Sequence, residues 1–173
     1  WSSFGTIKAI GAVEVPKCAA PQISYNNGKI TIASETEGAE FITTVTNSYA
    51  KNYYTEEFDI EATYNISVYA TASGYENSET VNAILCWIEN GENDENNNVI
   101  NIPAKAVLVT SNNGTINITC SLEGESVELY TSDAMFIEST TIENGCATIE
   151  SGLSKGDIAI VKIGEKSIKI IID

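Results

Sequence analysis

The sequence predicts an all-β protein made of two tandem immunoglobulin-like β-sandwich domains. Apolar and polar residues alternate in many short stretches rich in Thr, Val, Ile and Tyr, and Gly, Asn and Asp separate these stretches. Helical periodicity is nearly absent. The two halves also resemble each other, because NNGKITI at 26–32 returns as NNGTINI at 112–118. Short strands with turn signals between them are typical of β-sandwiches, and the repeat favours two of them.

Each copy of the repeat contains an Asn-Gly pair, Asn27-Gly28 in one and Asn113-Gly114 in the other. Asn-Gly between alternating segments is the strongest short signal for a two-residue hairpin, because that turn needs positive φ at both central residues. We therefore expect each pair to close the hairpin between the first two strands of its half.

Alternation also predicts which side chains face each core. In the first sandwich the residues expected to belong to the core or to border it are Ile66, Val68, Ile84 and Trp87. In the second, those expected to contribute to the core are Ile116, Ile118, Leu129, Ile160 and Ile170. A strand displaced by one residue would turn all its side chains to the opposite face, so these positions test the predicted faces.

Residues 89–98 read ENGENDENNN and contain no apolar side chain. Such a segment cannot join a core, so it predicts a solvated linker, and its acids lack the spacing of a calcium-binding loop. The expected organisation is a connector at 1–17, a first sandwich at 18–89, a linker at 90–100 and a second sandwich at 101–173.

The charge balance excludes several classes of partner. The chain has 173 residues, is 43% hydrophobic and carries a net charge of −15, so it is too apolar to be disordered. All nine basic residues are Lys, against 24 acidic residues, and the positive surface that nucleic acids and anionic lipids require is missing. No apolar run approaches the roughly 18 residues of a membrane span. We expect a monomer without nucleic-acid partners and without insertion into a membrane.

The four cysteines fall two to each half. An even number of cysteines fits disulfides in an oxidising compartment, and it equally fits four buried free thiols that act as small apolar side chains. The candidate pairs are Cys18 with Cys86 and Cys120 with Cys146. Since the chain has no CxxC motif and no His, we expect no metal site and no activated catalytic thiol.

Residues 47–54, NSYAKNYY, form the only plausible helical turn, with Asn47 placed as its N-cap. This segment carries Tyr49, Tyr53 and Tyr54, which are the candidate binding residues. Exposed Tyr rings suit a sugar or a protein partner, whereas the simpler interpretation is that they cover the open edge of a small sandwich.

Nothing in the sequence points to catalysis. Without His, acid–base chemistry falls to carboxylates, Lys or Tyr, and none of the common GxSxG, P-loop or HExxH patterns is present. The abundant acids are better explained as a solvated outer face. We expect no enzymatic activity and no cofactor.

Three stretches in the first half carry a family resemblance: CAAPQISYNNGKI at 18–30, ETEGAEF at 35–41 and TYNISVYATASGYENSETVNAILCWI at 63–88. They resemble an immunoglobulin-like module of Bacteroidetes surface proteins that is related to the C-terminal domain of chitobiases and hexosaminidases. WSSFGTIKAI at 1–10 is similar to the tail of a BspA-type leucine-rich repeat, which implies a repeat array upstream.

The second half resembles the C-terminal sorting domain of proteins exported by the type IX system. The matching stretches are SVELYTSDAMFIES at 126–139 and LSKGDIAIVKIGEKSIKIII at 153–172. The chain departs from that pattern at Ser132-Asp133-Ala134, where the family has Gly, and at Asp173, where the family has a basic residue.

Together the resemblances imply a function. They imply the non-catalytic C-terminal stalk or anchor of a secreted or cell-surface leucine-rich-repeat protein at the outer membrane, which presents its repeats for adhesion to a host protein or glycan. The alternatives are a carbohydrate- or protein-binding sandwich in its own right and, from the chitobiase-like resemblance, an accessory domain of a glycosidase.

Overall fold

The computed structural model describes residues 14–26, 29–47, 63–88 and 105–173, and within these ranges every regular element is a β-strand. The predicted all-β class is confirmed. The strands are β1 (Gln22–Asn26), β2 (Lys29–Ala33), β3 (Glu40–Asn47), β4 (Tyr64–Thr71), β5 (Val81–Ile88), β6 (Lys105–Asn112), β7 (Thr115–Cys120), β8 (Ser126–Thr131), β9 (Phe136–Thr141), β10 (Cys146–Glu150), β11 (Ile158–Ile163) and β12 (Lys166–Ile171).

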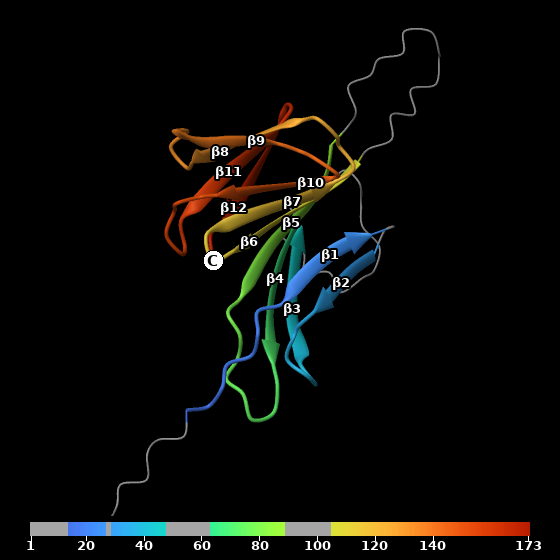
Figure 1. Ribbon diagram of the computed structural model, residues 1–173, viewed down its shortest axis with the longest axis vertical. Helices are drawn as coiled ribbons and strands as arrows, with labels where there is room; N and C mark the ends of the chain where they lie inside the picture. Colours follow the sequence, from blue (N-terminus) through green and yellow to red (C-terminus); the bar gives the residue numbers. More distant parts are fainter. Residues whose placement is uncertain (1–13, 27–28, 48–62, 89–104) are drawn as a thin grey trace, which may run out of the picture.

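The strands form three antiparallel sheets. β1 and β2 make a hairpin, six strands form a sheet in the order β10-β7-β6-β5-β4-β3, and four form a sheet in the order β12-β11-β8-β9. Figure 1 shows the six-stranded sheet running between the hairpin and the four-stranded sheet, so the architecture is that of packed β-layers.

The six-stranded sheet is continuous through both halves of the sequence. β5 from the first half pairs with β6 from the second, from Asn82↔Ser111 to Ile88↔Lys105. The expectation of a linker between two separate sandwiches did not include this pairing; residues 89–104 lie outside the described part. Along β5 both faces are apolar, and a short continuous apolar run is typical of a strand covered on both sides.

Two apolar cores lie on opposite faces of this shared sheet. The first contains Tyr64, Ile66, Val68, Ala83, Leu85, Trp87 and Leu108, with Ile23, Tyr25, Ile30 and Ile32 of the hairpin packed against it. The second contains Ile84 and Cys86 together with buried residues from β6 to β12. Each core therefore takes side chains from both halves.

The predicted core residues are buried, with one exception. Ile84 faces the second core rather than the first. Ile160 is the exception, because Ala159, Val161 and Ile163 point inward and Ile160 alternates with them on the outer face, where it is half-buried. Its assignment to the core was wrong because β11 is apolar on both faces, so alternation alone does not select the inner one.

Of the two predicted Asn-Gly turns, the structure describes only the one in the second half. Asn113 and Gly114 have φ of 51° and 80° and join β6 to β7, which confirms the expected two-residue hairpin. Asn27 and Gly28 lie outside the described residues, although the flanking strands pair there. Asn47 ends β3, and the rest of the proposed helical turn is also outside the described part.

Candidate functional site

The predicted binding residues Tyr49, Tyr53 and Tyr54 lie outside the described residues, so the site has to be sought elsewhere. The hollows among the described residues include two that are lined mainly by polar residues. One, of about 560 Å³, is lined by Thr140, Thr141, Glu143, Asn144, Cys146, Ala147 and Thr148. The other, of about 310 Å³, lies where the two halves meet and is lined by Glu79, Thr80, Val81, Asn112, Asn113, Lys155 and Asp173.

The four cysteines are free thiols in the structure, and neither of the candidate disulfides is formed. Cys18 is buried, and its backbone N–H donates to the carbonyl of Glu76 at 2.9 Å. Cys86 is buried in the second core, where desolvation raises the pKa of its thiol to about 11. Such a thiol stays protonated and acts as a small apolar side chain.

In the second pair of cysteines, Cys146 lines the larger hollow, whereas Cys120 is not part of its lining. Cys146 is exposed and pairs in register with Thr119 of β7. Cys120 follows Thr119, and successive side chains of a strand point to opposite faces, so the two thiols do not face each other. Cys120 packs against the second core, and burial raises the pKa of its thiol.

The larger hollow is lined by residues with hydroxyl, carboxylate, amide and thiol side chains and by Ala147. Its turn is held by Glu123, whose carboxylate accepts the backbone N–H groups of Asn144 at 3.0 Å and Gly145 at 3.1 Å. This carboxylate is therefore engaged in fixing the turn. Among the described residues no group of three His, Cys, Asp or Glu side chains has the arrangement of a metal site.

The smaller hollow borders a group of hydrogen bonds among Asn82, Ser111 and Asp173, here called the clamp. The clamp joins the end of β12 to the line along which β5 and β6 pair, here called the seam. Asn82 donates to the Asp173 carboxylate twice, through its side-chain Nδ2 at 2.6 Å and its backbone N–H at 3.2 Å. The backbone N–H of Asp173 donates to Ser111 Oγ at 3.2 Å. Since Asn82 lies near the start of β5 and Ser111 pairs with it from β6, the clamp ties the last strand of the fold to both sides of the seam.

Charges beside the clamp are paired across the halves. The Glu79 carboxylate accepts from Lys155 at 2.5 Å and also from Lys17. These two hydrogen-bonded ammonium groups lower the pKa of Glu79 to about 2. Asp173 shifts the other way, because burial raises the pKa of its carboxyl group to about 6 against the opposing effect of Asn82.

The Asp173 carboxyl group is expected to make the stability of the protein depend on pH. Its ordinary pKa is 3.8, so between about pH 4 and 6 the folded protein holds a proton that the unfolded chain has lost. The stability contributed by this group is fully present below that window and is lost as the pH rises through it. Glu79, Glu128 and Asp133, whose pKa values are lowered, act in the opposite direction at lower pH.

Comparison with Asp173→Asn isolates the effect of this one group. We expect the variant to gain melting temperature relative to the unmodified chain as the pH is raised from 4 to 7, because only the latter acquires a half-buried charge. Glu165→Gln, which removes an exposed carboxylate from the β11–β12 turn, is the matched control. The prediction is contradicted if the melting temperature of Asp173→Asn, relative to the unmodified chain, stays constant or falls as the pH is raised.

No sequence signal predicts the clamp. Asn82 and Asp173 are separated by 91 positions, and neither belongs to a motif. Only the pairing of β5 with β6 and the packing of β12 against them bring the two residues together.

Comparison with known protein families finds none that matches the chain. A search among curated proteins also finds no match. Where the structure describes the chain, we find no helical segment with the length and hydrophobicity needed to span a lipid bilayer.

Proposed function

We propose that the chain is a non-catalytic stalk of a secreted or cell-surface protein, which holds recognition segments, such as leucine-rich repeats, at a fixed distance from their attachment point. One observation carries the proposal. The pairing of β5 with β6 makes a single sheet of the two halves, and each face of that sheet is covered by an apolar core. Such a body resists bending at the junction, whereas sandwiches joined by a free linker would not.

Further contacts across the junction support a rigid body. The clamp between Asp173 and Asn82 and the ion pair between Lys155 and Glu79 both join the second half to the first. The resemblances of the two halves to surface modules and to a type IX sorting domain of Bacteroidetes support the location outside the cell. They also support a role in adhesion.

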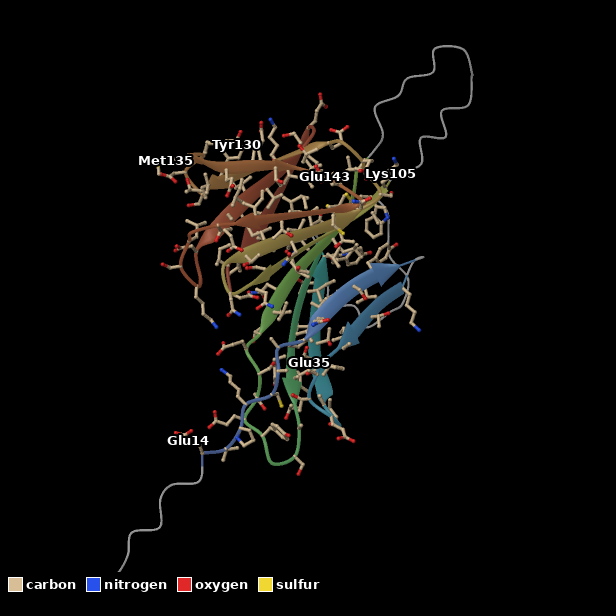
Figure 2. The ribbon with its side chains drawn as sticks, in the orientation of Figure 1. Glu14, Glu35, Lys105, Tyr130, Met135 and Glu143 are labelled. Atoms are coloured by element: carbon tan, nitrogen blue, oxygen red, sulfur yellow. The ribbon has the colours of Figure 1, made fainter. Side chains whose placement is uncertain are left out.

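The stalk function is tested by the distance between spin labels on the two halves. Labels are placed at Glu35→Cys, in the first half, and Met135→Cys, on the four-stranded sheet (Figure 2). Cys120→Ser and Cys146→Ser remove the more accessible thiols, and the buried Cys18 and Cys86 remain. Pulsed electron–electron double resonance, on labelled chains diluted in an excess of unlabelled chain so that only distances within one chain are seen, is expected to give one narrow distance distribution.

A second label pair supplies the control width. Met135→Cys with Glu165→Cys places both labels on hairpins of the four-stranded sheet, so their distribution shows the spread within one rigid unit. A distribution between the halves that is much broader than this control, or that has two maxima, rules out a rigid stalk. Specific binding of the isolated chain to a glycan array favours the alternative, a carbohydrate-binding module.

A further inference from the structure

The outer face of the four-stranded sheet carries apolar side chains that no described element covers. Met135 and Phe136 at the β8–β9 turn are 60% and 59% exposed, and Ile171 on β12 is 51% exposed. Between them lie the half-buried Ile158, Ile160 and Tyr130. In Figure 2 the labelled Tyr130 and Met135 lie at the β8–β9 side of this sheet. An exposed apolar patch of this kind marks an interaction surface.

Strand register arranges this face in rows that cross all four strands. One row reads Lys169, Ile160, Tyr130, Phe136 from β12 to β9. The next row reads Ser167, Lys162, Glu128, Ser139. The rings of Tyr130 and Phe136 meet edge to face with centroids 5.7 Å apart, which fixes the aromatic end of the first row.

These rows are self-complementary under a twofold axis. When two copies face each other about an axis that is parallel to the strands and passes between β8 and β11, each row meets itself in reverse order. Ile160 then faces Tyr130 of the second copy, and Lys169 faces Phe136 of the second copy. An ammonium group over an aromatic ring is a favourable contact, and the arrangement is the isologous one that a symmetric dimer requires.

In the same twofold arrangement, opposite charges on the second row face each other. Lys162 faces Glu128 of the second copy, and Glu128 faces Lys162 of the second copy. Within one chain these two groups already form an ion pair at 3.2 Å, with side chains 45% and 34% exposed, so both remain accessible. β8 and β11 lie next to the axis, where the rotation of roughly 30° between packed sheets displaces side chains least.

We propose that the outer face of the sheet β12-β11-β8-β9 is a homodimer interface, with a second copy of this chain as its partner. The proposal replaces the expectation of a monomer and goes beyond the stalk function, since a dimer would join two stalks side by side. An anionic membrane fits this face less well, because a net charge of −15 repels it. A sugar fits less well because the edge-to-face rings offer no flat platform.

Sedimentation velocity over a range of concentrations tests the interface. We expect the unmodified chain to dimerise with a dissociation constant in roughly the micromolar range, as befits a modest, partly polar interface. Ile171→Glu is expected to weaken the dimer at least about tenfold, because it places a charge in the apolar part of the contact. Ile42→Glu is the matched control, since Ile42 is 48% exposed on β3, away from this face, and its dimerisation stays unchanged.

Charge reversal identifies the symmetric contact itself. Lys162→Glu and Glu128→Lys are each expected to weaken self-association at least about tenfold, because like charges then meet twice across the axis. Mixing the two variants restores a dimer, in which the carboxylate introduced at position 162 of one chain faces the ammonium group introduced at position 128 of the other. A heterodimer of the two variants cannot arise from misfolding or from an unrelated surface.

Four outcomes overturn the proposal. The first is a chain that stays monomeric up to about millimolar concentration, and the second is that Ile42→Glu and Ile171→Glu weaken self-association equally. The third is that the mixture of the two charge variants does not associate. The fourth is a monomer that uses Phe136 to bind anionic vesicles or a glycan.

Discussion

Leu85→Ala is expected to lower the free energy of unfolding by about 2–5 kcal/mol, which is the usual cost of emptying a fully buried leucine site. Leu85 lies on β5, is 0% exposed and packs in the first core. Its neighbours Ile84 and Cys86 reach the second core from the same strand. We therefore expect the loss to destabilise both halves in one transition.

Chemical denaturation with two probes measures this effect. In a Trp1→Phe background the fluorescence of Trp87 reports the first core, and far-UV circular dichroism reports strands of both halves. The two curves are expected to coincide and to move together in Leu85→Ala. Ile42→Ala, at a half-exposed position of β3, should stay within about 0.5 kcal/mol. Separate transitions for the two probes would show that the halves unfold independently.

The fold class followed from local patterns, and so did the β6–β7 turn. Val, Ile and Thr alternation predicts strands because such side chains suit a pleated, half-buried surface. Asn113-Gly114 predicts its hairpin because the backbone there needs positive φ, as the structure has it. Both signals act between residues close in sequence, which is why a single sequence is enough to read them.

Longer-range pairing was harder to predict. The run Ala83–Trp87 is apolar at every position, and this indicates a strand covered on both faces without naming its partners. Local pattern offers no reason for β5 to pair with β6 across a polar segment. Ile160 shows a related difficulty, because the sequence of a strand that is apolar on both faces does not indicate which face points into the core.

The two faces of β11 also connect the fold to the proposed dimer. Ala159 and Val161 fill the second core, while Ile160 continues a row of side chains across the outer face. Ile160 is only half-buried in the monomer, so part of its apolar surface stays in contact with water. Its presence is accounted for when a second copy covers it, so the residue that was misassigned from the sequence is the central one of the proposed interface.

Gly145→Ala is expected to destabilise the protein by about 2–5 kcal/mol, through two effects that act at one position. Gly145 has φ of +75°, where an L side chain is disfavoured by about 1–2 kcal/mol. A Cβ atom there would also lie 2.6 Å from the carbonyl oxygen of Cys120, which is backbone and cannot rotate away. Relieving that contact requires a shift of β7 against the turn, at a further cost of about 1–3 kcal/mol.

Gly124→Ala separates these two effects. Gly124 has φ of +77°, and a Cβ atom there would meet nothing within 4 Å, so only the backbone effect remains. Thermal and chemical denaturation should therefore rank the unmodified chain first, Gly124→Ala second and Gly145→Ala third. Because the carbonyl of Gly145 accepts the backbone N–H of Cys120 at 2.9 Å, the larger loss should come with faster amide exchange at Cys120. Equal destabilisation by the two substitutions would show that the turn yields and that the close approach to Cys120 carries no cost.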